Sequence, residues 1–130
     1  NLHEAARHAA FTTDAALPPP VRAYGLAVRA MLHLKMGHIE AAVTAAEVAS
    51  ELLVRLQRID EGEAYIRLAC AEVLHASGDL EGARSAIADA WSRLDERARK
   101  IADTAVRERF LGRVPENART AARAKQWLAG

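Results

Sequence analysis

The sequence predicts an all-α fold made of stacked antiparallel helix pairs, and three observations lead to this prediction. The chain repeats itself at a spacing of 41 residues, a period typical of helical arrays in which each unit buries its apolar face against its neighbours. Alanine supplies 30 of the 130 residues, and it is accompanied by Leu, Arg and Glu, which are also strong helix formers. No segment alternates apolar and polar residues as a half-buried strand does, so we expect no sheet.

Matching positions in two consecutive units carry the repeat. Tyr24, Ala30, Gly37, Glu40, Ala42 and Ala49 recur as Tyr65, Ala71, Gly78, Glu81, Ala83 and Ala90. We expect turns at Gly37 and Gly78, because glycine readily adopts the left-handed conformation that ends one helix and lets the chain reverse. Small residues let two helices approach closely, and the predicted inter-helix packing positions are Ala30, Ala42, Ala71 and Ala83.

The positions of prolines, glycines and polar N-cap residues along the chain predict about seven helices. They are expected over residues 2–16, 19–36, 38–56, 61–77, 80–101, 104–112 and 116–129. The prolines at 18–20 end the first helix and open the second, because a first turn does not need the amide donors that proline lacks. Asp60, and either Asp103 or Thr104, are the predicted N-caps of the helices that follow them.

We interpret the chain as a single helical domain, 1–130. It divides into a leading helix (1–17), a first repeat unit (18–58), a second repeat unit (59–101) and C-terminal capping helices (102–130). No run of 18 apolar residues occurs, so we expect no membrane span. The single cysteine, Cys70, lies in an apolar run, which favours a buried structural thiol in a reducing cytoplasm. Because the first residue is Asn and no signal peptide opens the sequence, we expect a fragment of a longer cytoplasmic protein.

The spacing A-x-x-[HL]-x-x-x-G-x-[IL]-x-x-A occurs in both units, from Ala30 to Ala42 and from Ala71 to Ala83. This pattern resembles the tetratricopeptide repeat (TPR), and the resemblance implies an α-solenoid in which the first helix of each unit lines a concave, partner-binding face. The family's period is 34 residues, so the longer period here predicts about two extra turns in the second helix of each unit. The stretch FLGRVPENART at 110–120 is similar to the ends of repeat regions in large bacterial signalling proteins that carry a kinase or an ATPase module.

The residues do not form a pattern typical of catalysis or metal binding. His3 and His8 are five residues apart and diverge by about 140° around a helix, whereas a zinc-protease helix has histidines four residues apart. The serines lack a Gly-x-Ser-x-Gly context, and the seven glycines are too dispersed for a phosphate-binding loop. We therefore predict a protein that is not an enzyme and has no cofactor and no metal site.

The most concrete functional hypothesis is a non-catalytic protein–protein interaction scaffold. Its partner is a protein, a peptide, or adjacent repeats of the parent protein. The candidate partner groove on the concave face consists of Tyr24, Met31, Lys35, Tyr65, Glu72 and His75. A tyrosine offers contact area and a hydrogen bond at little entropic cost, although the two tyrosines could equally fill gaps between units. This hypothesis predicts an open concave face, whereas a structural module that self-associates as a homodimer would have the face filled by a terminal helix.

Nucleic-acid contact through the C-terminal helices is the second alternative. Residues 97–130 hold nine basic against three acidic side chains, while residues 1–96 hold nine basic against 14 acidic ones. Arginines could contact phosphates, and Trp127 could stack on a base. Because Asp103, Glu108 and Glu116 lie among the basic residues, we favour a solvated or acid-paired face over nucleic-acid binding.

Overall fold

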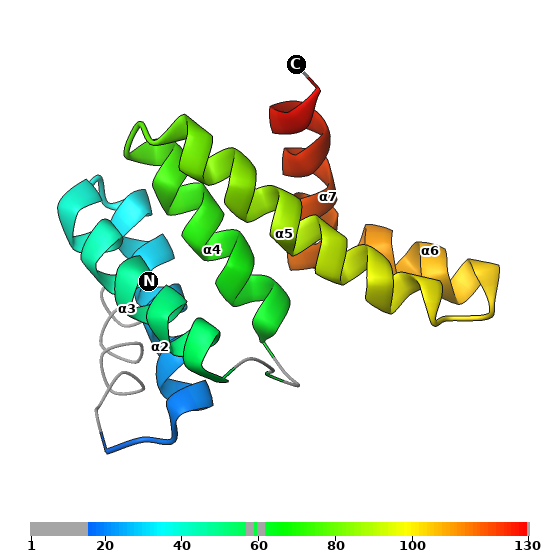
Figure 1. The fold of residues 1–130 in the computed structure, drawn as a ribbon, viewed down its shortest axis with the longest axis horizontal. Helices are drawn as coiled ribbons and strands as arrows, with labels where there is room; N and C mark the ends of the chain where they lie inside the picture. Colours follow the sequence, from blue (N-terminus) through cyan, green and yellow to red (C-terminus); the bar gives the residue numbers. More distant parts are fainter. Residues whose placement is uncertain (1–15, 57–58, 60–61, 130) are drawn as a thin grey trace.

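The computed structural model describes residues 16–56, 59 and 62–129, and over this part of the chain the all-helical prediction is confirmed (Figure 1). The helices are α2 (Pro19–Lys35), α3 (Ile39–Leu56), α4 (Glu63–Ala76), α5 (Leu80–Arg99), α6 (Thr104–Arg113) and α7 (Pro115–Leu128). Each end lies within two residues of its predicted position. The expected leading helix at 2–16 and the expected cap Asp60 lie outside the described residues. Among the described helices, none is long and apolar enough to cross a membrane.

The two predicted glycine turns have the same geometry. Gly37 and Gly78 have φ angles of 78° and 94°, in the left-handed region that favours glycine. In each turn the residue after the glycine donates its backbone N–H to the carbonyl oxygen five residues earlier, at 2.8 Å in the first turn and 3.0 Å in the second. The second turn continues into an N-cap, because Asp79 accepts a hydrogen bond from the Gly82 N–H at 2.9 Å. The two glycine turns thus share one backbone conformation.

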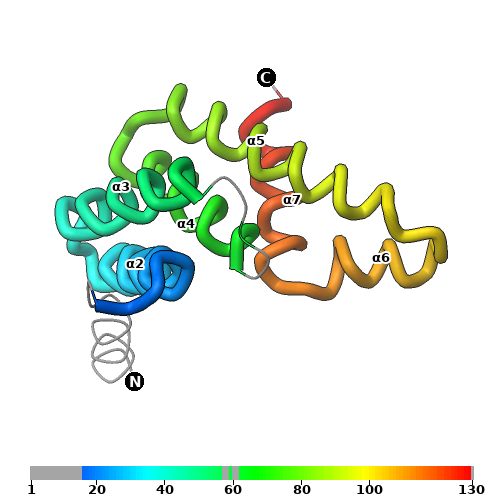
Figure 2. The backbone as a smooth tube through the Cα atoms, turned by 60° about the horizontal axis from the view of Figure 1, so that its bottom comes forward, coloured from blue at the N-terminus to red at the C-terminus, as the bar shows by residue number. Residues whose placement is uncertain are grey.

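Each glycine turn joins an antiparallel helix pair, α2–α3 and α4–α5, and α4 packs against both helices of the first pair (Figures 1 and 2). Ala30, Ala42, Ala71 and Ala83 have no exposed surface, as close packing within each pair requires. Between the pairs, Ile66 and Val73 of α4 are buried in one apolar cluster with residues of α2 and α3. The apolar core therefore continues from the first pair to the second.

The C-terminal third is arranged around the long helix α5. This helix has 20 residues and α4 has 14, so the end of α5 extends beyond α4, and α6 lies back along this overhang (Figure 1). Asp103 caps α6 by accepting a hydrogen bond from the Val106 N–H at 3.1 Å. Of the two residues predicted as the cap of this helix, Asp103 and Thr104, the structure therefore has Asp103. Helix α7 then returns to pack against α4, α5 and α6.

Candidate functional site

A groove with a volume of about 470 Å³ lies over α4 and has walls from α2 and α7. Its lining consists of Met31, Leu34, Lys35, Tyr65, Leu68, Glu72, Pro115, Glu116 and Arg119. Four of the six predicted groove residues are in this set: Met31, Lys35, Tyr65 and Glu72. The predicted groove set contains no residue of α7, although the structural alternative expected a terminal helix at this face.

Helical periodicity explains why α2 and α4 present these side chains together. Met31, Leu34 and Lys35 are three and four residues apart, and Tyr65, Leu68 and Glu72 follow a similar spacing on α4, so each set lies on one face of its helix. Met31 and Leu34 are half-buried against the core and Leu68 is buried, whereas Lys35 is exposed. The groove therefore combines an apolar floor with a charged rim.

Tyr24 and Tyr65 contact one another rather than lining the groove as a row. Their ring centroids are 5.3 Å apart with an interplanar angle of 39°. The Tyr24 ring also covers Gly62, where an added Cβ would come within 2.6 Å of a ring carbon, yet 44% of Tyr24 remains exposed. Burial raises the pKa of Tyr65, and the neighbouring Tyr24 and Glu116 raise it further. The two rings thus form a packing contact between α2 and α4, and Tyr65 also lines the groove.

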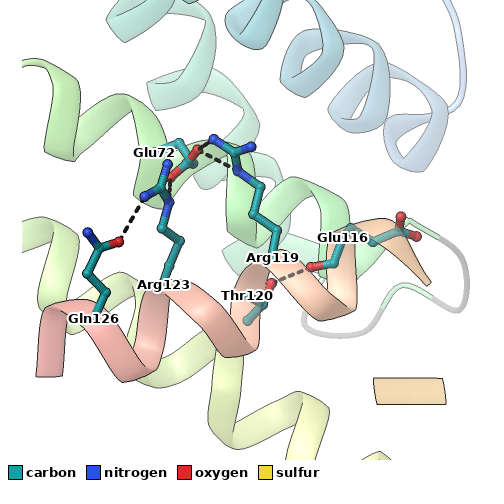
Figure 3. Close-up of polar contacts among 6 residues, drawn as sticks. All are labelled: Glu72, Glu116, Arg119, Thr120, Arg123 and Gln126. Atoms are coloured by element: carbon teal, nitrogen blue, oxygen red, sulfur yellow. Dashed lines mark hydrogen bonds and ion pairs between the residues drawn. The ribbon is translucent and has the colours of Figure 1, made fainter. Parts of the chain in front are cut away.

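Glu72 is held by α7 (Figure 3). Its side chain points toward Arg119 and Arg123 of α7, and only 7% of the residue is exposed. Arg119 donates from Nε to one carboxylate oxygen at 2.8 Å, and Arg123 donates from Nε to the other at 2.7 Å. A buried carboxylate needs such charge-assisted hydrogen bonds to offset its lost hydration. Glu72 is therefore part of the α4–α7 contact and is not presented to solvent.

His75 is also engaged by α7. Its ring stacks on Trp127, with centroids 4.3 Å apart and an interplanar angle of 2°. The Arg123 guanidinium lies 5.5 Å from the centroid of the same Trp127 ring. The part of the predicted concave face beside α2 is thus open as the groove, and α7 packs over the neighbouring part, as the structural alternative expected of a terminal helix. Glu72 belongs to both parts, because it lines the groove and pairs with α7, and His75 contacts Trp127 but remains exposed.

The chemistry of the described residues offers no cluster for a metal. Groups of three or more His, Cys, Asp or Glu side chains able to hold an ion are absent from the described part of the chain, and His3 and His8 lie outside it. Cys70 is half-buried, and its Sγ lies 3.6 Å from the carbonyl oxygen of Ala46. Burial raises the Cys70 pKa to about 11, so the thiol stays protonated at neutral pH and is a poor nucleophile.

Several basic residues of the C-terminal helices have partners within the molecule. These pairs are Arg97 with the Phe110 ring, Arg99 with Asp95, Arg107 with the Ile101 carbonyl oxygen, and Arg119 and Arg123 with Glu72. A phosphate backbone would have to compete with these internal contacts for the same donors. Three of these five arginines, Arg99, Arg119 and Arg123, pair with a carboxylate, so part of the basic surface is acid-paired.

The docking of α7 on α4 has one signal in the sequence. Glu72 lies between Ala71 and Val73 in a stretch of α4 that is otherwise apolar, and a glutamate at a buried position requires a cationic partner. Arg119 and Arg123 are four residues apart and so share one face of a helix. The ion pairs they form join residues 47 and 51 positions apart, which local periodicity does not reveal.

Comparisons of this chain with protein-family models, with curated proteins and with solved structures gave no match. A functional assignment therefore depends on the geometry of the groove and of the helices that form it.

Proposed function

We propose that the chain is a non-catalytic, TPR-like module that binds a segment of a partner protein in the groove over α4. The observation that carries this proposal is the groove itself, because its floor of Met31, Leu34 and Leu68 is apolar while its rim is charged. Concave sites for peptides and ligands commonly combine apolar surface with a few polar groups that fix orientation. The floor would take apolar side chains of the partner.

The charged rim would set the orientation of the bound segment. Lys35 of α2 is exposed, and Glu116 of α7 lines the same groove with the opposite charge. A bound segment with an acidic residue toward Lys35 and a basic residue toward Glu116 would be favoured over the reversed orientation. The expected partner segment is thus apolar at its centre and carries opposite charges at its two ends.

The solenoid arrangement is supported by a recurring packing relation. Helix α7 packs against both helices of the pair α4–α5, as α4 packs against both helices of the pair α2–α3. We infer that α2, α4 and α7 are successive first helices of one array and that α6 is an insertion covering the overhang of α5. In this interpretation α7 begins a third unit, and the segment 102–130 is more than a cap. The resemblance of residues 110–120 leads us to place the module in a longer cytoplasmic bacterial signalling protein.

Peptides selected from a random library against the wild-type chain would test this proposal. Met31→Glu adds a charge to the groove floor, and Val54→Glu is the matched control, because Val54 is 73% exposed on α3 and does not line the groove. We expect Met31→Glu to weaken peptide binding about tenfold or more, which corresponds to about 1.4 kcal/mol, and Val54→Glu to leave it unchanged. Circular dichroism checks that both variants remain helical. Selected peptides that bind both variants as they bind the wild type would refute the groove.

A further inference from the structure

The face that α7 turns toward α4 has a regular chemical pattern. Arg119, Arg123 and Trp127 are spaced four residues apart and lie on one side of the helix. The two arginines pair with Glu72, and Trp127 stacks on His75. Helix α4 thus receives a basic and aromatic helix on this side, and the polar part of the contact consists of two ion pairs and one ring stack. The apolar part is a cluster in which Ala124 and Trp127 pack with Leu68 and Ala71 of α4 and with α5.

The apolar cluster that holds α7 is smaller than the one that joins α4 to α2 and α3. The buried residues of α7 are Asn117, Thr120 and Ala124, none of which is a large apolar residue. The Asn117 amide donates to the Phe110 carbonyl oxygen at 3.0 Å, and the Thr120 hydroxyl donates to a carbonyl oxygen of its own helix. Hydrophobic burial scales with apolar area, so it contributes less to this contact than to the α2–α4 contact. Ion pairs between partly exposed groups are also weakened by salt.

The connection to α7 is a single residue. Val114 lies between the end of α6 and the start of α7 at Pro115, with φ −77° and ψ 117°, an extended conformation. The start of α7 has no side-chain N-cap, but the hydrogen bond from the Asn117 amide to the Phe110 carbonyl oxygen joins it to α6. Rotation about Val114 can move α7 as a rigid helix with the backbone hydrogen bonds inside α6 and α7 kept, at the cost of this one hydrogen bond.

Building on the proposed function, we propose that the surface of α4 beneath α7 is a second binding site. Its partner is a helix with arginines at i and i+4 and an aromatic residue at i+8, and α7 occupies the site when no partner is bound. Such a helix replaces the polar contacts of α7 with α4, because its arginines take the place of Arg119 and Arg123 on Glu72 and its ring stacks on His75. A helix without the arginines would leave Glu72 buried and unpaired, which selects against it. Release of α7 also removes one wall of the groove and lengthens the concave face.

The test adds the sequence of α7 as a separate peptide to the full chain. In the variant Arg119→Glu/Arg123→Glu, the resident helix is repelled by Glu72. The matched control is Arg109→Glu/Arg113→Glu, because these arginines of α6 are also four residues apart and exposed. The probe is a fluorescent synthetic peptide with the wild-type sequence of residues 114–129. We expect it to bind the first variant at least about tenfold more tightly than the control variant or the wild type, and to lose this affinity when it carries Arg123→Ala.

Equal binding of the peptide to a helical Arg119→Glu/Arg123→Glu variant and to the control would overturn the second site. If that variant does not fold, hydrogen exchange on the wild type decides. Raising NaCl from about 0.05 M to about 1 M should speed exchange in α7 about tenfold or more and leave α2 and α4 unchanged, because the Debye length falls to about 3 Å. If the amides of α7 are as protected from hydrogen exchange as those of α4 at both salt concentrations, a partner helix cannot replace α7 on α4. Neither the peptide-binding result nor the hydrogen-exchange result concerns library peptides whose binding depends on Met31. The groove proposal and the second-site proposal can therefore fail separately.

Discussion

Helix α4 has two neighbours along the array, α2 and α7, and the two contacts differ in chemistry. Toward α2 and α3, α4 buries Ile66, Ala69 and Val73 in a continuous apolar cluster. Toward α7 it presents Glu72 and His75, which bind arginines and a tryptophan ring, and it buries Leu68 and Ala71 in a smaller apolar cluster with Ala124. An apolar contact loses its whole stabilisation when opened to water, whereas arginines and a carboxylate released into water are hydrated again. The α2 contact is therefore mainly apolar, whereas the α7 contact combines exchangeable polar contacts with less apolar burial.

The two buried glutamates of α4 show the same contrast within one helix. Glu63 receives two hydrogen bonds from Arg93 of α5, at 2.7 and 2.8 Å. Because α5 is joined to α4 through the Gly78 turn, Arg93 stays near Glu63 whenever the helix pair is formed. Glu72 instead depends on a helix that follows a one-residue hinge. The position of the partner in the chain, more than the strength of the ion pair, decides which contact can open.

The largest expected effect comes from the apolar side of α4. Ile66 has no exposed surface, so Ile66→Ala should lower the free energy of unfolding by about 2–5 kcal/mol through lost burial and a residual cavity. Urea unfolding followed by far-UV circular dichroism measures this change. Val54→Ala, on the exposed face of α3, is the control and should cost less than about 0.5 kcal/mol. A similar cost for the two variants would mean that α2 and α3 do not form a tight core with α4.

On the α7 side, Glu72→Gln should act locally. The variant removes the charge that Arg119 and Arg123 share, and we expect the opening free energy of α7 to fall by about 1–3 kcal/mol. Hydrogen exchange of the amides in 118–128, compared with those of α2 and α3, measures the difference. Glu47→Gln on the exposed face of α3 is the control. An equal loss of protection in all helices would show that α7 unfolds only together with the rest of the chain.

The ion pair within the α4–α5 hairpin should make stability depend on pH. Burial tends to raise the pKa of Glu63, but hydrogen bonds and charge from Arg93, with the charge of Arg67, outweigh it and hold the pKa below its usual 4.5. A carboxyl with a lowered folded pKa stabilises the fold above its unfolded pKa, and this contribution is lost as pH falls through the folded value. We expect the wild type to exceed Glu63→Gln by about 1–2 kcal/mol at pH 7, with the difference shrinking below pH 4.5. Urea unfolding over a pH series measures it, and a pH-independent difference would contradict the assignment.

Much of the helical framework could be predicted from sequence because its causes are local. Prolines, glycine turns and caps fix the ends of helices within a few residues of chain, so the limits of α2 to α7 were predicted to within two residues. Gly37 and Gly78 adopt the backbone conformation expected from the repeat. Part of the groove followed as well, since Met31 and Lys35 lie on the predicted face of α2.

A terminal helix over the concave face was one of two alternatives, and the sequence could not decide between them, because nothing local determines where a helix docks after a one-residue hinge. The contacts of α7 pair Glu72 with Arg119 and Arg123 across α5 and α6. For the same reason His75 was placed in the groove, although it stacks on Trp127. Tyr24 was placed there from its register with Tyr65, but it leans over Gly62 instead. The repeat fixes positions along each helix, and long-range packing decides which of those positions stay open.

The smallest expected effect is the difference between two glycine substitutions, and it measures how tightly α2 and α4 pack once backbone strain is subtracted. Gly62 and Gly37 both have positive φ angles, 83° and 78°, so substitution by Ala should cost about 1 kcal/mol at either position from backbone strain alone. An added Cβ meets nothing within 4 Å at Gly37, whereas at Gly62 it would come within 2.6 Å of the Tyr24 ring. Gly62→Ala should therefore be the more costly of the two by about 1 kcal/mol, the amount typical of an overpacked contact, as measured by urea unfolding. Equal costs would mean that the Tyr24 ring moves aside freely, and the contrast between a fixed α2 side and an exchangeable α7 side would then lose its steric basis.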